Sequence, residues 1–271
     1  MKFSPRTDLA IEHETIRSNK PKSGFLHKRR SENGIETDCV TVLDKKGEKA
    51  LDRPIGRYVT FTFNTPENEN LLRTLTAELK RMLGKNGKRL LCVGLGNRAI
   101  TADAIGPMTV DRLEITGHLE NENGNRLFAI APGVLGKTGI EGFTLIKAAC
   151  EAANATALLC IDALAAQSTK RLYQTVQLGT SGIVPGSGIG NHRHALTEDT
   201  LGVPVIAIGV PTVVSSATLL FDTLTALDLS PLVPPLEKAL SESEPFFVTP
   251  PDADSQSEAL AGVIASAINS L

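Results

Sequence analysis

Apolar and polar residues follow two different periods between residues 58 and 84. Residues 58–63 (YVTFTF) alternate between apolar and small polar side chains, which is the pattern of a half-buried strand. Thr65, Pro66 and Glu67 then supply a capping residue, a proline for the first helical position and an acid for the first turn. The segment therefore predicts a strand and then a helix that ends at Gly84, with an apolar stripe made of Leu71, Leu72, Leu75, Leu79, Met82 and Leu83.

Short apolar runs alternate with helical patterns along the rest of the chain. They predict strands at residues 90–95, 127–131, 158–161 and 203–208, and helices at residues 108–116, 140–153, 216–227 and 259–271. The strand segments are continuously apolar, so both faces of the sheet should be covered, as in parallel or mixed sheets with helical crossovers. We predict an α/β fold: a single domain with a mostly parallel central sheet covered by helices.

The two ends of the chain differ from this core in composition. Residues 1 to about 50 are polar and charge-rich, and we interpret residues 9–55 as a loosely packed N-terminal arm. Residues 230–235 (SPLVPP) form a turn-rich connection. We therefore divide the chain into the arm, an α/β core at residues 56–228 and a C-terminal segment at residues 229–271.

Composition narrows the possible functions. The 271 residues include 28 basic and 30 acidic side chains, for a net charge of −2, so the chain lacks the basic field typical of nucleic-acid binding. Aromatic residues make up only 4%, which also disfavours base stacking. No apolar run approaches the roughly 18 residues of a membrane span, and the N-terminus lacks a signal-peptide core. We expect a cytoplasmic protein without direct nucleic-acid or membrane partners.

The four cysteines indicate no metal or disulfide framework. Cys39, Cys92, Cys150 and Cys160 form no C-x-x-C pair, and two of them lie within apolar runs. We interpret them as buried free thiols in a reducing compartment.

Two glycine-rich segments resemble phosphate-binding loops only in part. Residues 93–99 (VGLGNRA) follow a predicted strand, but no strand ending in an acid lies about 20 residues further on, as a dinucleotide site requires. Residues 131–138 (APGVLGKT) end like a P-loop, but Ala131 stands where that loop needs glycine and Pro132 has no N–H. A third glycine loop, residues 185–191, reads as a surface loop. We expect no nucleotide and no other cofactor.

Two aspartates stand where ligands bind in α/β sheets. Asp162 follows an apolar run, so it is predicted at the C-terminal end of a strand, and Asp103 lies seven residues beyond Gly96 on the loop after another strand. Two poorly solvated carboxyl groups in contact would share one proton. One could then take a proton from water while the other protonates a leaving group, which is hydrolysis without a metal. Each aspartate taken alone also fits a helix N-cap, and this alternative stays open.

Other catalytic patterns are weaker. The nucleophile-elbow motif G-x-S-x-G is absent. His192 and His194 flank Arg193 and could bind a metal, but we interpret them as solvated loop residues and expect no metal site.

Long blocks of the sequence resemble the germination protease family of spore-forming bacteria, whose members degrade small acid-soluble spore proteins. The blocks follow in family order and cover nearly the whole chain: residues 6–10 (RTDLA), 94–97 (GLGN), 101–107 (TADAIGP), 131–136 (APGVLG), 138–141 (TGIE), 160–166 (CIDALAA), 185–191 (PGSGIGN), 201–214 (LGVPVIAIGVPTVV) and 247–250 (FVTP).

The resemblance implies an endopeptidase with an aspartate-based site on a core similar to the hydrogenase-maturation proteases. The family's active-site aspartates fall on Asp103 and Asp162. Relatives that mature hydrogenases bind nickel near these positions, whereas this family is not thought to need a metal. We expect the glycine loops to shape the cleft and to offer N–H groups to the oxyanion through Gly94, Gly96, Asn97, Gly186, Gly188 and Gly190.

Family members are also zymogens that trim their own N-terminus, and they cut after an acid and before an apolar residue followed by alanine. Asp8-Leu9-Ala10 fits that pattern, so we predict cleavage between Asp8 and Leu9 with residues 1–8 as propeptide and residues 9–271 as the peptidase domain. Expected partners are small acid-soluble spore proteins and further copies of the chain in a homo-oligomer, in the forespore or spore core. An ordinary terminal segment is the alternative for residues 8–9.

The chain departs from the family at several positions. Ala102, Gln167 and Ser215 replace a usual proline, arginine and aspartate, and the stretch between residues 228 and 246 is short. The short segment bears on substrate selection and oligomeric state, and the changes at Gln167 and Ser215 could alter the charge around the site without removing the catalytic pair. Two alternatives stay open: a catalytically inactive relative that binds spore proteins without cutting them, and a nickel-dependent peptidase of the maturation type.

Overall fold

The computed structural model describes residues 7–13, 16, 23–119, 125–184, 194–229 and 246–271. In this part of the chain a single nine-stranded sheet is flanked by helices, with the strand order β1-β2-β3-β7-β8-β6-β4-β5 and β9 beside β8. The strands are β1 (Phe25–Glu32), β2 (Ile35–Val42), β3 (Gly56–Thr62), β4 (Arg89–Gly94), β5 (Arg126–Ile130), β6 (Ala157–Ala166), β7 (Thr175–Gly179), β8 (Val205–Ser215) and β9 (Phe247–Val248). The helices are α2 (Lys45–Leu51), α3 (Glu69–Leu83), α4 (Ile105–Val110), α5 (Leu135–Thr138), α6 (Gly142–Ala153), α7 (Glu198–Leu201), α8 (Ser216–Ala226) and α10 (Ala253–Asn269), with 3-10 turns η1 (Ala10–Glu12), η2 (Thr101–Asp103) and η3 (Thr169–Arg171).

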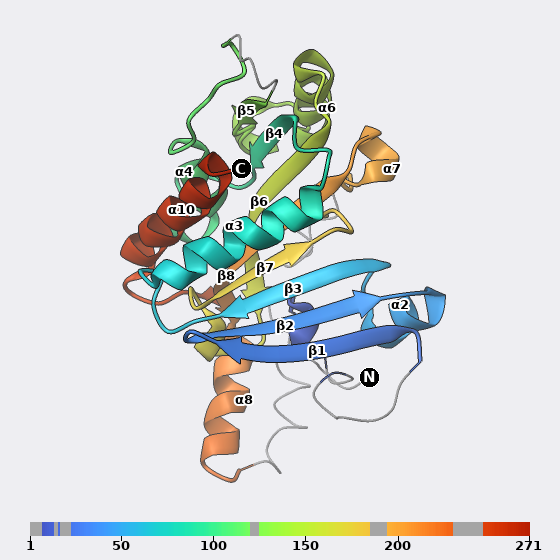
Figure 1. Ribbon diagram of the computed structural model, residues 1–271. Coiled ribbons are helices and arrows are strands. Elements are labelled where there is room, and N and C mark those ends of the chain that lie inside the picture. The colour runs from blue at the N-terminus through green and yellow to red at the C-terminus, as the bar shows by residue number, and fades with distance from the viewer. Residues whose placement is uncertain (1–6, 14–15, 17–22, 120–124, 185–193, 230–245) are drawn as a thin grey trace.

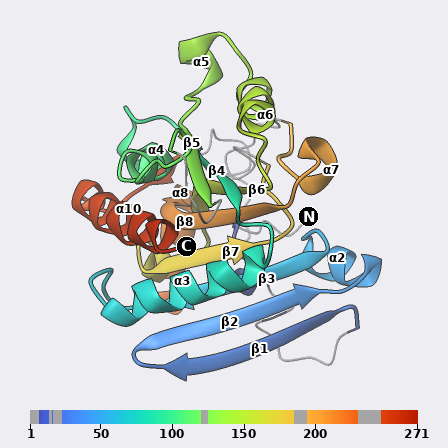
Figure 2. The ribbon, with the colours of Figure 1, turned by 45° about the horizontal axis from the view of Figure 1, so that its top comes forward.

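The sheet is mixed. Strand β4 pairs in parallel with β5 and β6, and β6 pairs in parallel with β8. The remaining pairings, from β1 through β2, β3 and β7 to β8 and from β8 to β9, are antiparallel. Figure 2 shows β1 and β2 at one edge of the sheet and β5 at the other. The α/β class is therefore confirmed, whereas the description "mostly parallel" holds only for the half of the sheet around β4, β6 and β8.

Helices cover both faces of the parallel half. Figure 1 shows α3, α4 and α10 side by side across one face, and α10 contacts both of the others. Along β4, Leu90 and Cys92 belong to the core beneath these helices, while Leu91 and Val93 pack in a second core with Ile146 of α6. This two-residue alternation between two apolar cores explains why the strand sequence is apolar throughout.

Most predicted elements exist, but several boundaries differ. Helix α3 begins after Asn68, whose side chain caps it, rather than at Thr65. The predicted helix at residues 108–116 lies at Ile105–Val110, and α10 begins six residues before the predicted Ala259. Strands β6 and β8 extend well past the predicted ends at residues 161 and 208. Strand β7, which follows a polar turn, was not predicted.

The prediction of a loosely packed N-terminal arm is wrong for residues 25–42. These residues form β1 and β2, joined at Asn33-Gly34, where both residues have positive φ values of 52° and 76°. Asn-Gly favours this hairpin geometry because both residues tolerate positive φ. Strand β2 then pairs along its length with β3 and buries Val40 completely, so the hairpin extends the sheet.

The helices among the described residues include none that is long and apolar enough to cross a lipid bilayer.

The C-terminal helix α10 should be essential to the stability of the core. Leu260, on the buried face of α10, is fully buried in the core, so Leu260→Ala is expected to lower the free energy of unfolding by about 2–5 kcal/mol because it leaves a cavity. Urea denaturation would measure the loss. As a matched control, Gly262→Ala adds a methyl group with nothing within 4 Å and should stabilise the helix by up to about 1 kcal/mol. A neutral Leu260→Ala variant would contradict this account of the core.

Candidate active site

The site lies at a step in the sheet, where strand β4 ends and the neighbouring strand β6 continues. Strand β4 ends at Gly94, opposite Ile161 of β6, and the Leu95 N–H donates to the Ile161 carbonyl at 2.8 Å. Strand β6 continues to Ala166, paired on its other side with β8. Asp162 is the first β6 residue beyond this step, opposite Gly209 of β8. It therefore lies at the end of β4 within a continuing β6, and the prediction that it ends its own strand is wrong.

Asp103 reaches the same region from the loop after β4. It is the last residue of η2, and its Oδ2 accepts a hydrogen bond from the Asn97 N–H at 2.8 Å. Gly96 has a φ of 109°, and a Cβ there would overlap the carbonyl oxygen of Asp103. The absence of a side chain at Gly96 thus lets the loop fold tightly around the aspartate.

Neither aspartate is a helix cap. The residue at the N-cap of α4 is Ala104, and Asp162 lies inside β6, where its Oδ1 accepts the N–H of Ala163 at 3.0 Å. The N-cap alternative for both residues is therefore wrong.

The two aspartates face common space. Both line a cavity of about 910 Å³, and both also line a smaller one of about 70 Å³. The residue Asp162 is only 7% exposed, whereas Asp103 is half-buried. Two carboxyl groups therefore open on the same cavities from separate elements.

Two N–H groups of the first glycine loop, residues 93–99, already donate hydrogen bonds within the protein. A Cβ at Gly94 would overlap the Gly106 carbonyl oxygen, so this glycine allows α4 to pack against the end of β4. The Leu95 and Asn97 N–H groups already bind Ile161 and Asp103. Asn97 therefore orients a carboxylate, and its N–H is not available to an oxyanion in this arrangement. Gly186, Gly188 and Gly190 lie outside the described residues.

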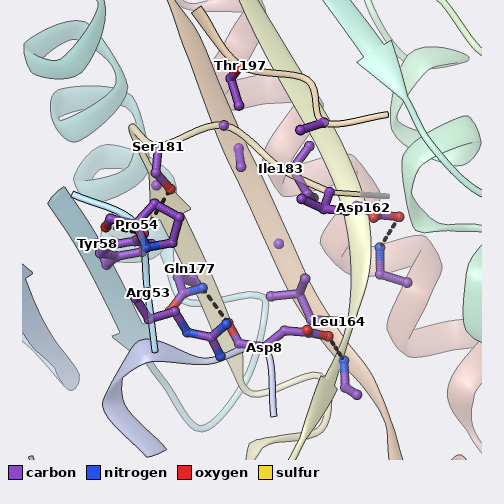
Figure 3. Close-up of a pocket in the computed structure, with 18 of the residues that line it drawn as sticks. Asp8, Arg53, Pro54, Tyr58, Asp162, Leu164, Gln177, Ser181, Ile183 and Thr197 are labelled. Atoms are coloured by element: carbon purple, nitrogen blue, oxygen red, sulfur yellow. Dashed lines mark hydrogen bonds between the residues drawn. The ribbon is translucent and has the colours of Figure 1, made fainter. Parts of the chain in front are cut away.

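The predicted cleavage site near the N-terminus lies against the same cavity. Asp8 lines its wall, and its Oδ2 accepts the Ala165 N–H at 2.8 Å. Figure 3 shows Asp8 beside Arg53 and Gln177, with Asp162 and Ile183 elsewhere along the pocket. Leu9 is fully buried. The remaining residues of the predicted propeptide, 1–6, lie outside the described residues.

Other nucleophiles and ligands are poorly placed. Burial raises the pKa of the Cys160 thiol and the Asp162 carboxylate raises it further, while burial likewise raises the pKa of the Cys92 thiol. His194 is exposed, lines the smaller cavity and packs on Phe143 at 5.3 Å between ring centroids, and His192 lies outside the described residues. In the part of the chain that the structure describes, no three His, Cys, Asp or Glu side chains are grouped as metal ligands would be.

Some residues that shape the site carry no signal that sequence reasoning used. Thr212 is fully buried at an irregularity of β8, and its hydroxyl donates to the Ala102 carbonyl at 2.6 Å, which fixes η2, the turn that ends at Asp103. Gln177 of β7 and Arg53 after α2 also line the larger cavity. A lone threonine or glutamine within an apolar strand would have been the only clue.

The tight loop around Asp103 should tolerate no side chain at residue 96. Gly96→Ala is expected to lower the free energy of unfolding by more than about 1 kcal/mol, since the positive φ and the overlap with Asp103 both oppose a methyl group. Urea denaturation would measure it against Gly136→Ala, a helical position with open space around the added Cβ. Equal stability of the two variants would show that the loop is looser than described.

Comparisons with known proteins agree on one family. The family model described as germination protease matches residues 6–229. The chain is 40% identical to the germination protease of Clostridium perfringens, with 82% of this chain and 74% of that protein covered. It is 34% identical to the germination protease of Clostridium acetobutylicum over 98% of this chain and 94% of that protein. For the germination protease of Bacillus subtilis the identity is 41% over 81% of this chain and 66% of that protein. With the family model spanning most of the chain and these identities over most of its length, the chain belongs to the germination protease family.

Proposed function

We propose that this chain is an endopeptidase of the spore that begins the degradation of small acid-soluble spore proteins at germination, with Asp103 and Asp162 as its catalytic residues. The observation that carries the proposal is that these two carboxyl groups, from separate elements, line the same cavities at the step of the sheet. Membership of the germination protease family supports the peptidase activity and its protein substrates.

The proposed reaction is a direct attack of water on the peptide carbonyl. With one proton shared by the pair, the ionised carboxylate takes a proton from water as the oxygen attacks the carbonyl carbon. The protonated partner then gives its proton to the amide nitrogen as the C–N bond breaks, and an acid and an amine leave. The pair thus ends with the single proton it began with. The Asn97 N–H donates to the Asp103 carboxylate at 2.8 Å and orients it.

We further propose that the chain is made as a zymogen and cleaves itself between Asp8 and Leu9. In the described arrangement Asp8 is bonded to Ala165, three residues past Asp162 on the same strand, or about 10 Å at ~3.3 Å per residue. Leu9 is fully buried in the core. Self-cleavage would therefore require this segment to leave its place.

A homo-oligomer stays a prediction. Figure 1 shows α8 projecting from the sheet, and the exposure of Leu219, Leu220 and Leu227 on and after this helix supports association of copies.

Replacing either aspartate by its amide should abolish proteolysis without loss of fold. Asp103→Asn and Asp162→Asn are each expected to slow cleavage of a purified small acid-soluble spore protein by about 10²–10⁴-fold, because an amide cannot exchange the proton. Asp228→Asn is the matched control, since Asp228 is exposed with a positive φ that asparagine tolerates. Full activity in either aspartate variant would overturn the mechanism. Stable binding of the substrate without cleavage by the unsubstituted chain would favour an inactive, binding relative.

Self-processing should be visible in the intact mass. After incubation of the full chain under acidic conditions, we expect loss of residues 1–8, and we expect no loss in Asp162→Asn. Electrospray mass spectrometry would distinguish this product from random proteolysis. An unchanged mass in the unsubstituted chain would leave residues 8–9 as an ordinary terminal segment.

A further inference from the structure

We propose that the edge of β6 beyond Asp162 is a strand-addition site that binds an extended, acid-bearing segment of the substrate, and that residues 7–12 of this chain occupy it. The inference rests on the proposed function and assigns substrate selection to backbone groups of residues 163–167. The edge exists because β4 ends at Gly94, while β6 continues beyond it.

Three successive N–H groups of this edge are bound by carboxylates. Beyond Ile161, the last β6 residue paired with β4, every second residue faces the same side. Ala163 donates to Asp162 at 3.0 Å, Ala165 to Asp8 at 2.8 Å, and Gln167 to Glu12 at 2.6 Å. The opposite side of β6 remains paired with β8 as far as Ala166. The first of these carboxylates belongs to β6 itself and the other two to the N-terminal segment, so the edge favours a ligand that brings carboxylates to Ala165 and Gln167.

At Asp8 the N-terminal segment is held as an added strand would be, and residues 10–12 then turn into η1. The Asp8 N–H donates to the Ala165 carbonyl at 2.9 Å, which pairs the two backbones at one residue. On the other side, the Gln177 amide donates to the Asp8 carbonyl at 3.1 Å and accepts from the Ala10 N–H at 2.8 Å. Arg53 donates to the Thr7 carbonyl. The contacts of Thr7, Asp8 and Ala10 use backbone groups and the Asp8 carboxylate, which another extended acidic chain also offers. The side chains of residues 9–11 in addition pack in the core, so a competing chain must also bring apolar residues.

The location of this edge connects binding to cleavage. Asp162, Ala163 and Ala165 line the same cavity, and Figure 3 shows Gln177 and Arg53 beside Asp8 within it. Exposed strand edges bind extended peptides through the main chain, and charge-assisted hydrogen bonds add selectivity. Since Ala165 lies about 10 Å from Asp162 along the strand, the acid bound there would stand about three residues from the peptide bond at the aspartates. Residues 7–12 then act as a built-in competitor for the substrate.

Peptide binding to the full chain tests this assignment. The protein carries Asp103→Asn throughout so that no turnover interferes. The probe is a fluorescein-labelled peptide with the sequence of residues 5–12 (PRTDLAIE), compared with its amide form PRTNLAIQ. Adding Asp8→Asn and Glu12→Gln to the protein weakens the built-in occupant. In anisotropy titrations, we expect the acidic peptide to bind this triple variant about tenfold tighter than it binds the Asp103→Asn protein. We also expect the triple variant to bind the acidic peptide about tenfold tighter than the amide peptide. Each tenfold difference corresponds to about 1.4 kcal/mol.

Two further variants separate edge recognition from a general charge effect. Adding Ala165→Pro removes the donor but no hydrogen bond to β8, so it should abolish the preference for the acidic peptide. A control protein carries Asp103→Asn with Asp52→Asn, without the changes at residues 8 and 12. Asp52→Asn removes a charge at an exposed helix end, so the affinity for the acidic peptide should equal that of the Asp103→Asn protein. If circular dichroism shows that Asp8→Asn with Glu12→Gln is unfolded, Asp8→Asn alone carries the same expectation.

Equal affinity for the two peptides, or an undiminished preference in Ala165→Pro, would overturn the inference. This failure is distinct from failure of the proposed function. If the unsubstituted protein cuts spore proteins but the variants show no preference for the acidic peptide, only the edge assignment is refuted. A chain that prefers the acidic peptide but cuts no protein refutes only the proposed activity.

Discussion

The early end of strand β4 is the constraint on which the site depends. Gly94 and Gly106 pack so closely that a Cβ on Gly94 would overlap the carbonyl oxygen of Gly106. Helix α4 therefore crosses the end of β4 and prevents the strand from running on beside β6. Buried N–H and carbonyl groups must find partners, so the unpaired side of β6 collects polar groups in the middle of an otherwise apolar sheet. Asp162, Asp8 and Glu12 all lie there for that reason.

The same step separates two kinds of buried acidic group. On the apolar side, Cys160 sits one residue before the step, where burial raises the pKa of its thiol and keeps it neutral. On the polar side, Asp162 has an N–H donor at Ala163 and an opening to the cavity. A shift of two residues along β6 thus changes a side chain from one packed in the apolar core to one that lines the cavity. This contrast supports carboxyl rather than thiol chemistry at this position.

Sequence reasoning predicted the elements of the parallel half and singled out the two aspartates that line the cavities, because continuous apolar runs and acids after them are local signals. It misplaced Asp162 relative to the end of β6, since Ala163, Leu164 and Ala165 are compatible with a loop or a strand and only pairing with β8 decides between them. It missed the β1–β2 hairpin because the charges of β1 outweighed the Asn33-Gly34 turn signal. The roles of Thr212 and Gln177 depend on contacts more than 100 residues away in sequence, which no local pattern contains.

The N-terminal segment shows why its polar, charged sequence wrongly indicated a loosely packed arm. Glu12 is only 4% exposed, yet it is an acid in a polar stretch, and its carboxylate binds the Gln167 N–H and lies 3.5 Å from Arg171. Burying such a charge is costly unless hydrogen bonds and a cation compensate it, and here both are present. The cost is balanced only while the segment stays on the edge of β6. A segment held by charge-assisted contacts rather than by apolar packing alone can be displaced by a chain that brings the same groups, which is the physical basis for exchange between an internal occupant and a substrate.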